Sequence, residues 1–198
     1  SYLQANAWSD YRKNLLVDEK QHPYTGKPYA WVRSRVVGGK THVWGRVALR
    51  MSDFDLKAKS RDGYGEDWPI SYADLSPYYD RVDRYLGISG VKEDLPQLPD
   101  SLYQRPIKMN AAEVKLRAAI APMGRVLTPA RVGVATEWLQ HNKYRSRCFG
   151  RGACSRKGGC DIHAAFDAPT GLLYPAMDTG NVWLRTSAIV HEVLVDPS

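Results

Sequence analysis

Apolar side chains recur at helical spacing between residues 71 and 87. A recurrence every three to four residues is typical of a helix that buries one face. The apolar positions are Tyr78, Val82, Tyr85 and Leu86. Ser71 and Asp74 form the S-x-x-D pattern of a helix start, and Gly87 is suited to end a helix. We therefore predict a helix over residues 77–86.

The same spacing predicts a second helix over residues 111–120, with Val114 and Leu116 among its apolar positions and a Pro and a Gly after its end. A short helix is predicted over residues 170–177. The polar segment over residues 52–69, with its Gly and Pro, is expected to run over the surface, and a long irregular connection is expected between the first two helices.

Short apolar or β-branched runs, bounded by Gly, Pro or a turn, predict four strands. They cover residues 31–37, 125–134, 182–185 and 189–195, the second of them interrupted at Thr128-Pro129. Residues 178–181 form the turn ahead of the last two strands. The chain therefore combines helices and strands.

The stretch after the first predicted strand carries the densest candidate chemistry. Gly38 and Gly39 allow positive φ or a close approach of the backbone to a flat ligand. The next residues offer a cation, a hydroxyl, an imidazole, an indole and a guanidinium, which suits phosphate or an aromatic cofactor; they are Lys40, Thr41, His42, Trp44 and Arg46. Taken alone, two adjacent glycines are better explained by a tight turn.

Three cysteines stand in a basic, glycine-rich segment, at equal intervals. Cys148, Cys154 and Cys160 are each separated by five residues, and core cysteines would instead lie in apolar runs. Three thiolates suit three irons of an iron–sulfur cluster, and His163 supplies a fourth ligand for zinc. Free thiols or one disulfide are the alternatives, and the odd number of cysteines fits a reducing compartment.

Charge adds one more functional alternative. The chain of 198 residues has a net charge of +7, and the excess is concentrated between residues 131 and 157. Its basic members are Arg131, Lys143, Arg145, Arg147, Arg151, Arg156 and Lys157. Such a patch more often covers an acidic neighbour or stays solvated than binds nucleic acid. An independent basic module, built on a metal-held cysteine loop and binding nucleic acid, is therefore the second hypothesis.

Targeting signals are not evident in this sequence. The first twenty residues have neither the basic and apolar regions of a signal peptide nor a transit pattern. No run of 18 apolar residues predicts a membrane span. The localisation stays open between cytoplasmic and periplasmic, and Ser1 in place of Met suggests that the chain is incomplete.

Three separated motifs carry a family resemblance. The run RVVGGKTHVWGR, the segment WPISYADLSPYY and the stretch YPAMDTGNVWL resemble, in the same order, the glucose-methanol-choline (GMC) family of FAD-dependent oxidoreductases. The resemblance extends from about Trp31 to Val195 and is greatest to bacterial sugar-oxidising members related to pyranose oxidases and gluconate dehydrogenase flavoprotein subunits. It implies an α+β fold, with part of a GMC-type FAD-binding fold and part of the substrate-binding sheet.

The resemblance also implies a division of the chain and a function. Residues 1–70 would cover the FAD, residues 71–165 would include the cap region and the cysteine loop, and residues 166–198 would return to the FAD-binding domain. The reaction implied is oxidation of a CH–OH group of a sugar, glycoside or polyol, with hydride passing to the flavin.

Site residues follow from the same resemblance. Cofactor contact is expected at Gly38, Gly39, Lys40, Thr41, Trp44 and Gly45, and through the main chain of Val190. Related sugar dehydrogenases hold an iron–sulfur cluster on three cysteines in a comparable place, while other relatives keep cysteines there without one. His42 is expected to bond to backbone, because the histidine that binds flavin covalently in some relatives aligns with Val43. Trp44, Tyr64 and Trp68 are candidates to line a sugar site.

Two parts of a GMC enzyme are not found in this sequence. The G-x-G-x-x-G fingerprint that binds the dinucleotide pyrophosphate is absent, and the catalytic histidine would lie beyond Ser198. We therefore name no catalytic residue and expect a middle segment of a flavoenzyme. Its expected partners are the remaining segments of the same enzyme and a small carbohydrate, with a homo-oligomer also possible.

Overall fold

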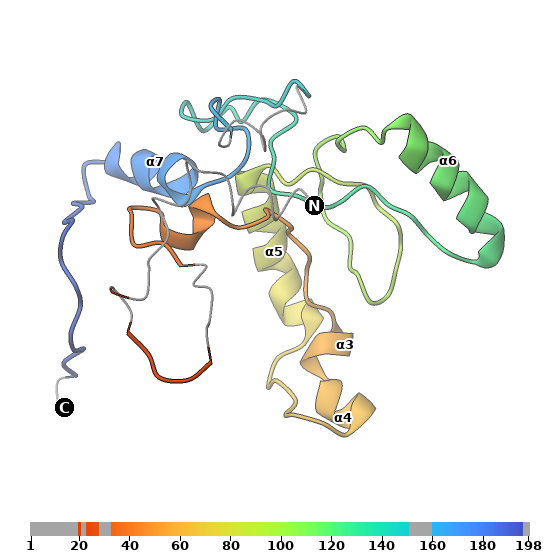
Figure 1. The fold of residues 1–198 in the computed structure, drawn as a ribbon, viewed down its shortest axis with the longest axis horizontal. Helices are drawn as coiled ribbons and strands as arrows, with labels where there is room; N and C mark the ends of the chain where they lie inside the picture. Colours follow the sequence, from red (N-terminus) through yellow and green to blue (C-terminus); the bar gives the residue numbers. More distant parts are fainter. Residues whose placement is uncertain (1–19, 21–22, 28–32, 151–159, 196–198) are drawn as a thin grey trace.

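The computed structural model describes residues 20, 23–27, 33–150 and 160–195 (Figure 1). Within them the α-helices are α3 (Asp53–Leu56), α4 (Ala58–Asp62), α5 (Tyr72–Leu86), α6 (Ala111–Ile120) and α7 (Tyr174–Met177). A π-helix over Pro169–Leu173 leads into α7, and 3-10 turns cover Gly39–His42 and Ala121–Met123. All three predicted helices are confirmed.

Helix α5 is the central element, and its ends form as its sequence indicates. The Ser71 hydroxyl accepts the N–H of Asp74, whose carboxylate accepts the N–H of Ser71 in return. At the other end Gly87 has φ 69°, a left-handed conformation that costs glycine little. The helix begins five residues before the predicted start at Pro77, because the capping pair at Ser71 sets its first turn.

Removing the Ser71 cap is expected to weaken this helix. Ser71→Ala leaves the N–H of Asp74 without its acceptor and should lower the free energy of unfolding by about 1 kcal/mol. Urea denaturation measures the change. Ser76→Ala lies inside the same helix, where it caps no end, and should change stability by less than about 0.5 kcal/mol. Equal losses in the two variants would contradict this role for Ser71.

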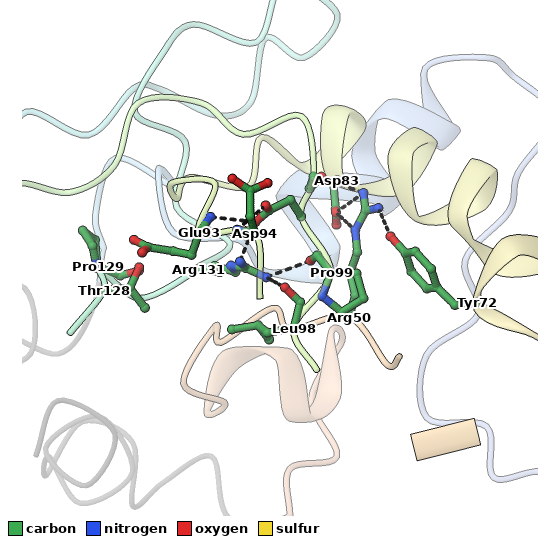
Figure 2. Close-up of polar contacts among 12 residues, drawn as sticks. Arg50, Tyr72, Asp83, Glu93, Asp94, Leu98, Pro99, Thr128, Pro129 and Arg131 are labelled. Atoms are coloured by element: carbon green, nitrogen blue, oxygen red, sulfur yellow. Dashed lines mark hydrogen bonds and ion pairs between the residues drawn. The ribbon is translucent and has the colours of Figure 1, made fainter. Parts of the chain in front are cut away.

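Arg50 fastens the segment after the glycine pair to α5 (Figure 2). Its Nε donates to Asp83 at 2.9 Å, and its Nη2 donates to Asp80 and to the Ser101 hydroxyl, both at 2.6 Å. The Tyr72 hydroxyl accepts from Nη1 at 2.9 Å. The guanidinium is buried and Asp83 is buried with it, so each charge depends on the other for its compensation.

A second buried arginine closes the long connection after α5. Arg131 Nη1 donates to the carbonyls of Leu98 and Pro99, and its Nη2 pairs with Asp100 at 2.6 Å (Figure 2). Its guanidinium also lies over the Tyr103 ring, 5.2 Å from the centroid. Two of the residues counted as a basic patch, Arg131 and Arg145, are thus buried in the interior.

Within the described residues, extended segments meet through single antiparallel or parallel bridges. Val132 pairs with both Val47 and Ser89, and Val134 pairs with Ala165. Within the predicted strand at 125–134, Val132 and Val134 are the residues that form bridges. The described part of 31–37 leads into a turn at 36–39, where the Gly39 N–H donates to the carbonyl of Val36. The strand prediction at 125–134 is wrong as a continuous element, because Pro129 and Gly133 interrupt the ladder. Over the described residues 33–37 no continuous strand forms, because the chain turns into the glycine pair.

The predicted strands at 182–185 and 189–195 are also wrong. These residues are extended and exposed beyond α7, where the trace runs clear of the rest of the described chain (Figure 1). A strand requires a neighbouring ladder, and the described residues give this segment none. Helix α6 likewise projects to one side, with Val114 and Leu116 about half exposed.

None of the helices in the described ranges is both long and apolar enough to cross a bilayer.

Candidate cofactor-contact loop

The glycine pair opens a compact turn. Gly38 has φ 94° and Gly39 has φ 50°, so both occupy the left-handed region that other residues adopt only with strain. The carbonyl of Gly38 accepts the N–H of Thr41 at 3.1 Å, and the carbonyl of Lys40 accepts the N–H groups of Val43 and Trp44, both at 3.0 Å. The loop therefore holds its shape by its own backbone bonds.

One face of this loop is fastened to residues 166–169. The Thr41 hydroxyl accepts the N–H of Ala168 at 2.9 Å, and the Trp44 indole N–H donates to the carbonyl of Phe166 at 3.3 Å. The Trp44 and Phe166 rings meet edge to face, with centroids 6.0 Å apart. A Cβ on Gly38 would lie 2.5 Å from Cδ of Pro169, so glycine is required there by packing. Thr41, Trp44 and Gly38 thus serve as attachments.

The other face of the loop, called the open face below, is less crowded by the described residues. A Cβ added to Gly39 would have the Ser34 carbonyl oxygen as its nearest neighbour, at 3.8 Å, and the Lys40 side chain is exposed. Gly45 is half-buried. The six residues predicted to contact a cofactor therefore divide into an attached set and an open set, and only Gly39, Lys40 and Gly45 remain for a ligand.

His42 behaves as expected from its place in the loop. One ring nitrogen, Nε2, lies 2.8 Å from the carbonyl of Val37. Because a carbonyl only accepts, Nε2 carries the proton in this contact. The bond to backbone that we predicted for His42 is confirmed.

Arg145 supports the segment on which the loop rests. Its guanidinium donates to the carbonyls of Leu86, Ala164 and His163 at 2.6, 2.9 and 3.2 Å. It also lies over the Phe166 ring, 5.5 Å from the centroid. Burial lowers the pKa of Arg145 to about 10, against the opposing effects of the nearby Asp167 and Cys160 charges, so it remains protonated at neutral pH. It joins the end of α5 to residues 163–166.

The turn into the π-helix has its own polar framework. Asp167 accepts the N–H and the hydroxyl of Thr170, both at 2.9 Å, and the Asn142 amide donates to the Thr170 carbonyl at 3.0 Å. A Cβ on Gly171 would collide with the Phe166 ring. These residues were not identified from the sequence, where the only local signal was the Gly that follows Pro169-Thr170.

The structure describes two of the three cysteines predicted to bind a cluster. Cys148 and Cys160 are reduced and half-buried, and Cys154 lies outside the described residues. The Gly150 N–H points to Cys148 Sγ and the Ala165 N–H to Cys160 Sγ, each at 3.4 Å. No three potential metal ligands gather within the described ranges.

The remaining predicted contacts are far more exposed. Val190 is 80% exposed on the extended segment, and Tyr64 is 82% exposed after α4. Trp68 is also exposed, and its carbonyl accepts from Lys57 at 2.7 Å. Among the described rings Trp44 contacts Phe166 but neither Tyr64 nor Trp68, so the structure does not bring the three proposed sugar-stacking rings together.

Comparison with known proteins places the chain beside oxidising enzymes. No family model matches it. It is 30% identical over 189 residues to paromamine 6'-oxidase of Streptomyces fradiae, a match that covers 89% of this chain and 31% of that protein. It is 28% identical over 165 residues to 6'''-hydroxyparomomycin C oxidase of Streptomyces lividus, covering 80% of this chain and 28% of that protein.

A third relative carries a different substrate name. The chain is 35% identical over 92 residues to 2-methyl-1,2-propanediol dehydrogenase of Mycolicibacterium austroafricanum, which covers 46% of this chain and 16% of that protein. The chain thus spans less than a third of the length of these relatives. All three are named as an oxidase or a dehydrogenase.

Proposed function

We propose that this chain is a section of an FAD-dependent oxidoreductase of the GMC type that oxidises a CH–OH group of a carbohydrate or polyol. The observation that carries the proposal is the similarity to two named oxidases over 89% and 80% of the chain. The diol dehydrogenase supports oxidation of a hydroxyl-bearing carbon. The remaining segments of the same enzyme are the proposed partners, since the sequence has no dinucleotide fingerprint.

The open face of the glycine loop fits a flat cofactor. Among the described atoms a Cβ on Gly39 would meet only the Ser34 carbonyl oxygen, at 3.8 Å, so a planar ring or a phosphate could approach this backbone, and the exposed Lys40 would supply a cation for a phosphate. Gly39, Lys40 and Gly45 would hold the cofactor, and Val190 would contribute main-chain groups. FAD, when bound, supplies the hydride acceptor.

The residues of this chain contribute orientation. Thr41 and Trp44 fix the loop to Phe166 and Ala168, so the open face is held at one angle. Arg145 fixes residues 163–166 to the end of α5 and gives that attachment a rigid base. A cofactor bound on Gly39 and Lys40 would therefore meet a loop that needs little ordering on binding.

An iron–sulfur cluster on Cys148, Cys154 and Cys160 stays a prediction, because Cys154 is outside the described residues.

The basic-module hypothesis receives no support from the interior of the chain. Arg131 and Arg145 are buried against carbonyls, and Lys143 is paired with Asp178 at 2.9 Å. Fewer cations thus remain for a polyanion than the sequence pattern indicates.

The test is a spectrum of the native protein. Flavin absorption bands are expected, and anaerobic addition of an oxidisable sugar or polyol should bleach them as the flavin is reduced. Heat denaturation should release FAD, identified by its mass. A colourless protein that binds no FAD when FAD is added would overturn the proposal. A panel of sugars, glycosides and diols, with dioxygen and a dye as alternative acceptors, then defines the donor.

A further inference from the structure

Two cysteines flank residues 149–159 and share one packing site. Cys148 and Cys160 both pack against a small cluster formed by Val134, Ala164 and Ala165. All three cluster residues are almost fully buried, with exposures of 6%, 0% and 5%. The backbone pairs on either side of the two cysteines, since the N–H of Ser146, two residues before Cys148, donates to the carbonyl of Ile162, two residues after Cys160, at 3.1 Å.

The backbone anchors each cysteine to the same pairing. The Cys148 N–H donates to the carbonyl of Ala135 at 2.7 Å, and the Ala135 N–H donates to Ala164 at 2.9 Å. Cys160 lies on the segment that pairs with residues 134–135. Its sulfur accepts the Ala165 N–H, and Ala165 forms a bridge with Val134. Both thiols are thus fixed relative to one short stretch of paired backbone.

We propose that Cys148 and Cys160 are a redox pair that closes to an intramolecular disulfide when a peroxide oxidises them. The two thiols lose two electrons and two protons as the S–S bond forms. Hydrogen peroxide accepts both as its O–O bond breaks, and two waters leave. The proposal does not depend on the flavin function, because it concerns only the two thiols and their oxidant.

Closure would act on the segment that carries the glycine loop. Cys160 begins the run that continues through Ala165 to Phe166 and Ala168, the two residues that bond to Trp44 and Thr41. A covalent link from Cys160 to Cys148 would fix the start of that run and close the chain between the two cysteines into a ring. The disulfide would therefore stiffen the support of the candidate site.

Peptide mapping of the native protein tests the pair. After treatment with hydrogen peroxide, thiols are alkylated in denaturant, so that buried thiols also react, and the intact mass is measured. The peroxide-treated protein should have lost two hydrogen atoms and should carry two fewer alkyl groups than the untreated protein. Trypsin then separates the three cysteines, because Arg147, Arg151, Arg156 and Lys157 surround them. Cys148–Arg151 should remain linked to the peptide containing Cys160, with the Cys154 peptide alkylated.

Two variants sharpen the assignment. Cys154→Ser should keep the linked peptide, and Cys148→Ser should abolish it. The wild-type map decides the question even where a variant fails to fold. A link that involves Cys154, full alkylation of all three cysteines after peroxide, or thiols protected by a bound metal in the intact mass would each overturn the proposal.

Discussion

Arg145→Met is expected to lower the free energy of unfolding by about 3 kcal/mol or more. The substitution keeps an apolar side chain of similar length but removes the donors to three carbonyls, those of Leu86, His163 and Ala164. The Ala164 carbonyl keeps the Ala135 N–H as a donor, whereas the Leu86 and His163 carbonyls lose the guanidinium. A buried acceptor left without a partner costs about 1–3 kcal/mol, and the loss of the cation over the Phe166 ring adds to it. Equilibrium denaturation in urea, followed by fluorescence, measures the change.

Arg147→Met is the matched control for this prediction. Arg147 is two residues away and exposed, so its loss should change stability by less than about 0.5 kcal/mol. Arg145→Lys keeps the charge but cannot reach three carbonyls at once, and it should fall between the two. Wild-type stability in Arg145→Met would show that the three carbonyls find other donors and would contradict the role assigned to Arg145.

Gly38→Ala is expected to lower the free energy of unfolding by about 3 kcal/mol, because overpacking adds about 1–3 kcal/mol and a positive φ about 1–2 kcal/mol. The new methyl group would lie 2.5 Å from Cδ of Pro169 and 2.6 Å from Nε2 of His42. The attached face of the glycine loop would have to separate from the π-helix. Urea denaturation of the native protein measures the loss, and a loss of bound flavin should accompany it.

Gly39→Ala separates stability from ligand binding. Its φ of 50° is also left-handed, but the nearest atom to the new methyl group would be 3.8 Å away. We expect a loss of about 1–2 kcal/mol from the backbone conformation alone. A methyl group on the open face should nevertheless lower flavin content more than its stability loss explains. Equal flavin content in Gly39→Ala and wild type would place the cofactor elsewhere.

Helices were predictable because their signals are local. The reciprocal bonds of Ser71 and Asp74 lie within four residues, and the capping pair Asn110 and Glu113 opens α6 in the same way. Gly87 ends α5 as its left-handed φ requires. The start of α5 was misplaced, since Pro77 was taken as a first-turn residue and lies inside the helix. The short helices α3 and α4 were not predicted, because their segment was taken as a polar surface stretch.

Strands and buried arginines were not predictable, because their partners lie far away in the sequence. The strand predicted at 125–134 consists of single pairings, and its partners Val47 and Ser89 are far away in sequence, so the local pattern could not show how it pairs. Arg145 looked like part of a basic patch, but it binds a carbonyl of α5 that lies 59 positions earlier. A sequence pattern shows the charge of such a residue and gives no sign of its acceptors.

The candidate site was predicted in outline and changed in its detail. The glycine pair and the bond of His42 to backbone were expected, whereas Thr41 and Trp44 use their polar atoms on residues 166–168. Whether a residue near a turn faces a ligand or packs against the protein depends on the segment it contacts, here residues 166–168, and the local sequence does not contain that segment. The resemblance identified the loop, and the contacts distinguish its two faces.

The exposed segment after α7 has a consequence for solubility. Trp183, Ile189, Val190, Val193, Leu194 and Val195 are each about 80% exposed or more. The described residues give this extended apolar run no paired neighbour, and such a run offers its N–H and C=O groups to any other strand edge, including that of a second copy. During synthesis this segment would tend to self-associate until a strand covers it, so the protein's yield should depend on how early that cover forms.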